Sequence, residues 1–173
     1  EIERHECSLA GGKQDQYAAT FGGFNFMEFM ANEIVIVNPL RIRRHIINEL
    51  ESSTILFYTG ASRESANIIK DQINSLDKGG SSLDAMHEIK SSAYKIKAKL
   101  LKGDIDQVAL SLKKSWEAKK ATSKSVSNSA IDNIEKVILT SGATSMKVSG
   151  AGGGGFIMIF VKPEIKRKVI RSL

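Results

Sequence analysis

The chain has 173 residues, with 25 Lys and Arg against 19 Asp and Glu, so its formal net charge is +6. Because 42% of the residues are hydrophobic and 25% are charged, the composition fits one globular domain, or two small ones sharing a core, and excludes a disordered chain. The one cysteine excludes an internal disulfide, and the longest apolar run, residues 156–161, is far shorter than the ~20 residues of a membrane span.

Hydrophobic periodicity and turn residues predict the elements in chain order. Before residue 53 the pattern predicts the tail of a helix, a short helix and two strands, over residues 1–7, 13–21, 24–29 and 33–37. Residues 42–50 are left open as a helix or a connection. From residue 54 the predicted order is strand, four helices, two strands and a helix that opens at Pro163. Runs of helices combined with antiparallel strands predict an α+β two-layer sandwich.

The predicted helices carry apolar side chains at steps of three and four, which places them on one face. In the first two helices after residue 60 this face is Ala66, Ile69, Ile73 and Leu76, and then Leu83, Met86, Ile89, Ala93, Ile96 and Leu100. The spacing of Tyr94 and Trp116 predicts that both are buried. The helix boundaries are marked by Gly103 and Gly142 at the ends and by Asp104 and Asn128 or Ser129 at the starts.

The positive charge is concentrated in one segment. Residues 87–124 hold ten lysines and four acidic residues, which equals the whole net charge of the chain. A basic stripe can bind phosphate, nucleic acid or a membrane surface, but such a run is more often a solvated helix face. We therefore expect no nucleic-acid and no membrane partner.

A glycine pair precedes the short helix of residues 13–21, in the run Gly11-Gly12-Lys13-Gln14-Asp15-Gln16-Tyr17. Glycines there let the backbone approach a ligand closely. Asp15 falls in the first helical turn, where the helix dipole and the nearby Lys13 favour its ionised form. An ionised aspartate that faces a hydroxyl can accept its proton during phosphoryl transfer. A capping aspartate is the alternative, and these seven residues alone favour it slightly.

A second cluster, Ser149-Gly150-Ala151-Gly152-Gly153-Gly154-Gly155, joins the last two predicted strands. Five glycines in six positions are more than a hairpin turn needs, and backbone amides in such a loop can cradle an anion. The run is not a GxxxxGK[ST] phosphate loop, because no Lys-Ser or Lys-Thr follows, and a strand rather than a helix comes next. From these residues alone, a wide hairpin loop or flexible linker stays equally open.

Together the two clusters, about 130 residues apart, resemble those of the GHMP kinase superfamily. The likeness is greatest to the sugar 1-kinases that act on D-glycero-D-manno-heptose 7-phosphate. It covers nearly the whole chain and is carried by residues 11–18, 21–26, 57–63, 116–120, 127–132 and 147–156.

The resemblance implies an α+β kinase of two domains with ATP bound in the cleft between them. Residues 1–52 would be the trailing part of an S5-like N-terminal domain, and residues 53–173 the C-terminal α/β sandwich. Asp15 matches the catalytic aspartate, which would activate or orient the anomeric hydroxyl. Glu3 lies close to the position of a Mg²⁺-ligating glutamate, although a plain helix-surface role is equally open for it. A bacterial cytoplasmic setting is also implied.

The same resemblance assigns substrate and phosphate contacts. Gly12, Lys13 and Gln14 match the substrate-binding stretch beside Asp15. The loop of Gly150, Ala151, Gly152, Gly153 and Gly154 matches the motif that supports the phosphate region. Arg63 follows a turn at a helix start, which suits the phosphate that the sugar already carries. Lys119 and Lys120 are weaker candidates for that contact, because a surface role is favoured for them.

One departure from the family is large. The main ATP loop, a Pro-x-x-x-Gly-Leu-x-Ser-Ser pattern, is absent from these residues, and the chain opens on Glu1 rather than Met. We therefore expect the C-terminal portion of such a kinase, which by itself should bind ATP poorly and not turn over.

Two alternatives stay open. Within the superfamily, the chain could have fucokinase-like or galactokinase-like specificity. From another class, it could be a non-catalytic module that binds polyanions through its lysine-rich helices, although Asp15 would then have no role. The sequence allows a homodimer and does not identify the oligomeric state.

Overall fold

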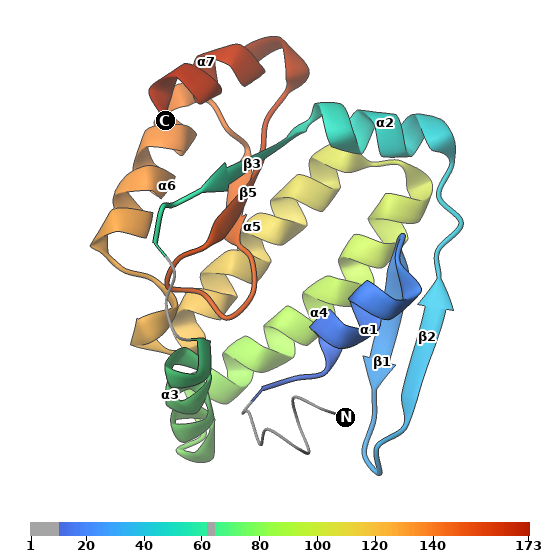
Figure 1. Cartoon of the computed structure of the whole chain (residues 1–173), viewed down its shortest axis with the longest axis vertical. Helices are drawn as coiled ribbons and strands as arrows, with labels where there is room; N and C mark the ends of the chain where they lie inside the picture. Colours follow the sequence, from blue (N-terminus) through green and yellow to red (C-terminus); the bar gives the residue numbers. More distant parts are fainter. Residues whose placement is uncertain (1–10, 62–64) are drawn as a thin grey trace.

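The computed structural model of the chain describes residues 11–61 and 65–173. Figure 1 shows a small antiparallel sheet packed among helices, with a separate two-stranded hairpin alongside. The elements are α1 Gln14–Phe21, β1 Asn25–Phe29, β2 Val35–Pro39, α2 Arg44–Ser52, β3 Thr54–Tyr58, α3 Ser65–Asp77, α4 Ser81–Lys102, α5 Ile105–Thr122, η2 Lys124–Val126, α6 Ser129–Ser141, β4 Ser145–Val148, β5 Phe156–Phe160, η3 Pro163–Ile165 and α7 Lys166–Ser172. The α+β class and the order predicted from residue 54 are confirmed, and residues 42–50 prove to lie mostly in a helix, α2.

The central sheet has the order β3-β5-β4, and both pairings are antiparallel. One of its faces is apolar, with Ile159 between Ile55 and Met146, and Ile157 beside Val148. This face forms the main hydrophobic core with side chains from α3, α5, α6 and α7. Burial of this much apolar surface is the main force that fixes the sheet and its helices.

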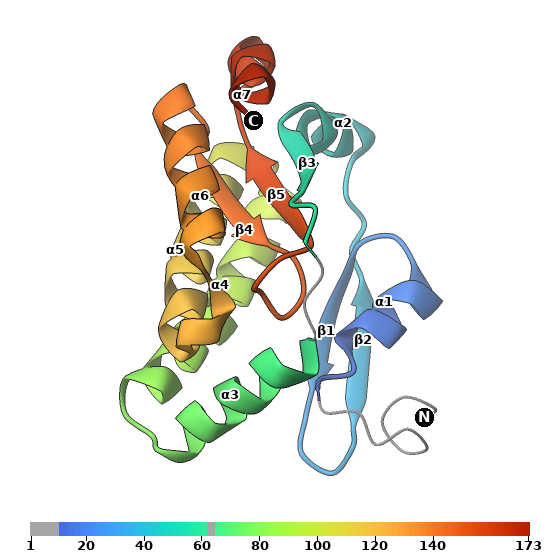
Figure 2. The same ribbon diagram turned by 60° about the vertical axis from the view of Figure 1, so that its left-hand side comes forward.

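The hairpin of β1 and β2 lies against α4 (Figures 1 and 2). The Phe26 ring, buried on β1, packs edge-on against Tyr94 of α4 at 5.1 Å between ring centroids. The ammonium of Lys97 lies 4.0 Å from the Phe26 ring centroid, in a cation–π contact. The Tyr94 hydroxyl donates to the Glu28 carboxylate at 3.1 Å. These contacts fix the hairpin, and with it the short helix α1 that precedes it.

A second core cluster connects α2 to the rest of the molecule. Ile46, which is 3% exposed, packs with Leu100 of α4, Ile105 of α5 and Phe160 of β5. The cluster therefore includes residues on both sides of position 53. Division into two domains at that position stays a prediction.

Two of the predicted apolar faces are partly wrong. In α3 the buried residue is Ile68, at 4% exposed, whereas Ile73 is 46% exposed. In α4, Leu83 and Met86 are exposed, and Tyr94 is 47% exposed instead of buried. The reason is that α4 packs against α5 on one side and the hairpin on another, so its contacts do not follow a single apolar stripe. Trp116 is fully buried, as predicted.

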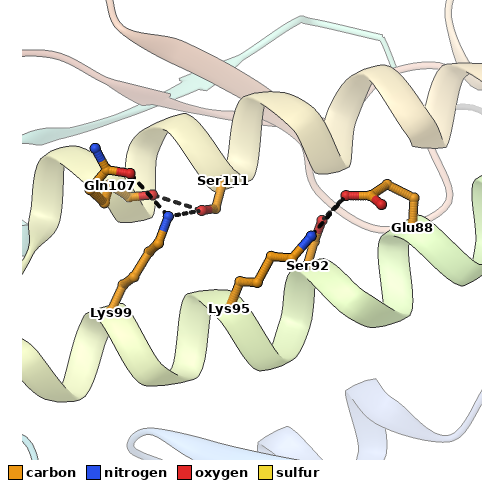
Figure 3. A network of polar contacts seen from close by, with 6 residues as sticks. All are labelled: Glu88, Ser92, Lys95, Lys99, Gln107 and Ser111. Atoms are coloured by element: carbon orange, nitrogen blue, oxygen red, sulfur yellow. Dashed lines mark hydrogen bonds and ion pairs between the residues drawn. The ribbon is translucent and has the colours of Figure 1, made fainter.

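The α4–α5 contact is partly polar. Ser92 of α4 and Ser111 of α5 are buried polar residues. Lys99 reaches from α4 to Gln107 Oε1 at 3.0 Å and Ser111 Oγ at 3.1 Å on α5 (Figure 3). Small side chains allow two helices to approach closely. At this short separation the Lys99 side chain spans the interface, and its ammonium is hydrogen-bonded on α5. One member of the lysine-rich segment thus joins two helices.

The predicted helix caps are largely confirmed. Asp104 accepts a hydrogen bond from the Gln107 amide at 3.2 Å and caps α5. Gly103 and Gly142 end α4 and α6 in the left-handed conformation. Within the described residues, no helix combines the length and apolarity needed to cross a membrane.

The packing of Ile46 yields a stability prediction. Ile46→Ala should lower the free energy of unfolding by about 3 kcal/mol, because it removes a buried side chain from a filled cluster. Ile36→Ala, at an exposed position of β2, should change it by less than about 1 kcal/mol. Urea denaturation of both variants measures the difference, and equal effects would contradict this view of α2.

Candidate active site

The glycine-rich loop connects β4 to β5 (Figure 2). Its base is closed by a hydrogen bond from the Ser149 amide to the Phe156 carbonyl at 2.8 Å. Gly150, Gly152, Gly153 and Gly155 all have positive φ, from 72° to 116°. Side chains other than glycine are strained in that region, so the loop shape explains why the sequence there is almost all glycine.

The loop is held to the backbone of neighbouring segments. The Gly153 amide donates to the Val126 carbonyl of η2 at 2.8 Å, and the Gly155 amide donates to the Ala61 carbonyl at 2.9 Å. A Cβ on Gly152 would lie 2.6 Å from the Val126 oxygen, and a Cβ on Gly154 would lie 2.8 Å from the Ala61 oxygen. Glycine is therefore required both for conformation and for close approach.

Asn128 connects the loop to α6. Its Oδ1 accepts hydrogen bonds from the amides of Ala130 and Ile131 at 3.0 and 3.1 Å, which caps the helix. Its Nδ2 donates to the Gly153 carbonyl at 3.0 Å. Both polar groups of the buried Gly153 are thus engaged, so this residue anchors the loop and does not line the cavity described next.

The loop borders a cavity of about 350 Å³. Its lining comes from the loop, from Phe156 at the start of β5, from Ser65 at the start of α3 and from Asp15 in the first turn of α1. The two clusters that the sequence singled out therefore meet at one site, although they lie about 130 residues apart. The amides of Gly150, Ala151 and Gly154 make no hydrogen bond to another described residue, which is the condition for an anion-binding loop.

The residues just before Asp15 do not line this cavity. Gly12 and Gln14 are exposed. Lys13, which we expected to favour the ionised form of Asp15, forms an ion pair with Glu33 instead. Their substrate-binding role stays a prediction, and so does the catalytic role of Asp15.

Two predicted site residues, Glu3 and Arg63, lie outside the described residues. In the part of the chain that the structure describes, no group of three or more His, Cys, Asp or Glu side chains is arranged to hold a metal ion. Asp15 is the one carboxylate among the residues that line the cavity. One carboxylate together with phosphate oxygens and water fits the usual surroundings of Mg²⁺ in kinases.

Two lysines lie at the edge of the glycine-rich loop. Lys119, in the last turn of α5, donates to the Gly150 carbonyl of the loop. Burial, reinforced by the nearby Lys147 ammonium and opposed by the Asp15 carboxylate, lowers the pKa of Lys119 to about 8. Burial also lowers the pKa of Lys147, on β4. Lys119 is thus close enough to both Lys147 and Asp15 to interact with them electrostatically at the edge of the loop.

As site residues, Lys119 is only weakly predicted by the sequence and Lys147 is not predicted at all. The signal for Lys147 was its position: it alternates with the buried Met146 and Val148, two residues before the glycine loop. A lysine inside a short, buried strand requires a reason. The signal for Lys119 was absent, because it lies among many other lysines of one helix.

Comparison with known proteins shows what the chain is similar to. Residues 96–173 match the model of the GHMP kinase C-terminal domain. The whole chain is 49% identical, over 173 residues, to D-glycero-alpha-D-manno-heptose 7-phosphate kinase of Campylobacter jejuni. Residues 96–173 thus form a GHMP kinase C-terminal domain. The chain covers 51% of that relative, so it spans about half the length of the curated protein that it matches over its full extent.

Two further proteins are similar to the chain over nearly its whole length. A crystal structure of a D-glycero-D-manno-heptose 1-phosphate kinase from Bacteroides thetaiotaomicron superposes with a TM-score of 0.74 at 43% identity, covering 100% of this chain and 45% of the other. The L-fucokinase/L-fucose-1-P guanylyltransferase of Bacteroides fragilis is 25% identical over 171 residues, which are 96% of this chain and 18% of that protein. The similarity to proteins named as heptose kinases is therefore much greater than the similarity to the fucokinase.

The close approach at Gly152 yields a second prediction. Gly152→Ala should destabilise the fold by about 3 kcal/mol, because the new Cβ meets the Val126 carbonyl in a conformation unfavourable for alanine. Gly150→Ala has a similar positive φ but open space around it, so it should cost only about 1 kcal/mol. Urea denaturation separates the two costs. If both variants lose equal stability, close packing against η2 does not hold the loop.

The lowered pKa of Lys119 yields a third prediction. A pKa of about 8 against the ordinary 10.5 corresponds to about 3 kcal/mol of destabilisation, and the hydrogen bond to Gly150 returns about 1 kcal/mol. Lys119→Met should therefore raise the free energy of unfolding at pH 7 by about 2 kcal/mol.

The sign of the pH dependence follows from linkage. The unfolded chain keeps the Lys119 proton up to about pH 10.5, whereas the folded chain releases it near pH 8, so the contribution of Lys119 makes the wild-type chain more stable as pH rises between these values. The advantage of Lys119→Met should shrink over that window. Urea denaturation at pH 7, 8, 9 and 10 tests this, with Lys114→Met at an exposed position of α5 as the control. A destabilised Lys119→Met at pH 7 would refute it.

Proposed function

We propose that the protein that carries these residues is an ATP-dependent sugar-phosphate 1-kinase, and that it phosphorylates the anomeric hydroxyl of D-glycero-D-manno-heptose 7-phosphate. The observation that carries the proposal is the meeting of Asp15 with the glycine-rich loop at one cavity. The 49% identity to a protein named as a heptose 7-phosphate kinase supports the choice of sugar.

In this proposal Asp15 is the residue that acts on the sugar. The C1 oxygen of the sugar forms a bond to the γ-phosphorus of ATP, the bond from that phosphorus to the β–γ bridging oxygen breaks, and the C1 hydroxyl proton passes to the Asp15 carboxylate. ADP leaves with the bridging oxygen. Such transfers need positioning and charge stabilisation rather than a covalent intermediate.

The loop supplies the phosphate contacts. Free amides at Gly150, Ala151 and Gly154 offer donors to phosphoryl oxygens, and their backbone is held in place by η2 and by the end of β3. A preorganised set of donors stabilises charge that develops in the transition state. Mg²⁺ would neutralise the phosphates of ATP, with Glu3 as its proposed ligand. Since ATP and sugar phosphates are cytosolic metabolites, we also propose a cytoplasmic location.

Fucose is the second candidate substrate. It is favoured by the 25% identity to a protein named as an L-fucokinase, over 96% of this chain. The discriminating feature is the phosphate at C7 of the heptose, which fucose lacks. A site for that phosphate needs a basic group away from the reacting hydroxyl, and Arg63 is the residue proposed for it.

An assay of the gene product that carries these 173 residues tests the function. With ATP and Mg²⁺, it should convert the heptose 7-phosphate to a 1,7-bisphosphate at least 100-fold more efficiently than it phosphorylates fucose or galactose. Coupling between phosphorus and the anomeric proton in the NMR spectrum of the product identifies C1 as the site. Preference for fucose would replace the first candidate by the second. The 173 residues alone should show no turnover.

The proposed role of Asp15 yields a fourth prediction. Asp15→Asn in the same gene product should lower kcat by 10²- to 10⁴-fold, because the amide cannot accept the proton. The KM for the sugar should change far less, since the amide keeps the size and polarity of the side chain. Asp71→Asn, at an exposed position of α3, is the matched control. A kcat for Asp15→Asn within threefold of the wild type would remove Asp15 from the chemistry.

A further inference from the structure

We propose that Lys119 and Lys147 form a phosphate-binding pair at the edge of the glycine-rich loop, and that they hold the phosphoryl group that is transferred beside Asp15. The assignment to the transferred group rests on the proposed function. The anion-binding character of the pair rests on the geometry of the described residues alone.

The first support is the position of the two lysines. Lys119 extends from the end of α5 to the loop, where its ammonium donates to the Gly150 carbonyl. An ammonium has three donors, and within the described residues only this one has an acceptor. Lys147 lies on β4, immediately before the loop, and makes no hydrogen bond to a described residue. Both side chains are only partly exposed.

The second support is the missing counter-ion. Two like charges that are partly removed from water repel each other, and such groups are normally paired with a carboxylate. Lys120, the next residue on α5, has this arrangement, since its ammonium lies 2.8 Å from the Glu135 carboxylate. Neither Lys119 nor Lys147 has a carboxylate within ion-pair distance in the described part of the chain. The nearby Asp15 acts on Lys119 only as a more distant charge.

The third support is the chemistry of the neighbours. Gly150 and Ala151 have free amides and lie where Lys119 touches the loop. Two ammonium groups at the edge of the loop, together with its free backbone amides, match the donor set of phosphate sites. The lowered pKa of both lysines agrees with this, because a phosphate dianion would restore the charged forms that burial disfavours.

A purely structural interpretation assigns Lys119 to clamping the loop and to interacting with the C-terminal dipole of α5. That interpretation predicts loss of stability when Lys119 is removed, and it gives Lys147 no role. The phosphate-binding proposal predicts that removal of either lysine weakens anion binding, although the fold stays intact.

The test uses the 173-residue chain labelled with ¹⁵N. Inorganic phosphate is added at pH 7, and the amide signals of residues 150–155 are followed. The wild type should show saturable shifts. Lys119→Met and Lys147→Met should each weaken binding at least tenfold. Lys114→Met, which removes the same charge from an exposed position of α5, should change it less than twofold.

Lys119→Arg should restore at least half of the binding free energy that Lys119→Met loses. Lys119→Met and Lys147→Met variants that bind phosphate as well as the wild type would overturn the proposal, as would shifts that do not saturate, which indicate an adventitious ion only.

A second measurement does not depend on any variant. Sulfate keeps its charge throughout neutral and alkaline pH, so its affinity reports the protein alone. The charged groups that face Lys119 are Lys147 and Asp15. Sulfate binding should weaken as pH rises from 7 to 9, because Lys119 loses its proton near pH 8. Binding that stays constant over this range would argue against Lys119 as the anion ligand.

Two sugar phosphates separate the sources of the phosphate. Mannose 1-phosphate carries its phosphate at the position of transfer, and mannose 6-phosphate carries it at the far end of the sugar. Tighter binding of the first, lost in Lys119→Met, is expected. Tighter binding of the second would refute the assignment to the transferred group. If the chain binds anions but the gene product does not phosphorylate the heptose, the proposed function is refuted and the proposal of the lysine pair stands. If Lys119→Met has normal kinetics, only the proposal of the lysine pair is refuted.

Discussion

The candidate site depends on backbone contact between the glycine-rich loop and two segments that come earlier in the chain. These segments are η2 and the residues just after β3. Hydrogen bonds from Gly153 to Val126 and from Gly155 to Ala61 fix the loop from both sides. The absence of side chains at Gly152 and Gly154 allows the two backbones to come that close. Because the contact is between main chains, the loop keeps its shape without occupying the cavity with side chains of its own. Rigid elements of this kind can position a reactive group precisely enough to matter in transfer chemistry.

Two lysines at the edge of this loop lack a carboxylate partner in the described part of the chain. Most lysines of α4 and α5 either lie in solvent or have a partner, such as the bridge from Lys99 to Ser111. Lys119 and Lys147 have no carboxylate partner among the described residues, and the burial of their ammonium groups, with their mutual repulsion, lowers the stability of the folded chain. Active sites often retain such unfavourable arrangements because the bound substrate relieves them. For anion binding, the position of these two lysines therefore matters more than the total net charge of the chain.

Much of the fold could be predicted from the sequence, because the local signals agree with the tertiary structure. Strand and helix order from residue 54, the caps at Asp104 and Asn128 and the burial of Trp116 all follow from local chemistry. The exposed side of α4 could not be predicted, since which residues are buried depends on two neighbours, α5 and the hairpin, that the sequence does not place. For the site, the motifs at Asp15 and the glycine loop identified two of its walls. The ion pair of Lys13 with Glu33 and the approach of Lys119 to Asp15 could not be found, because both pairs are far apart in the chain.

The dual role of Asn128 links the mobility of the loop to that of a helix end. One side chain holds the first turn of α6 and the Gly153 carbonyl at the same time. Helix ends fray on their own, with small opening free energies. Here, movement of the Asn128 side chain at the start of α6 also breaks one of the hydrogen bonds that hold the loop, so opening of the two segments is coupled. Hydrogen exchange at Ala130 therefore reports in part on the anchoring of the loop, at a position remote from the substrate itself.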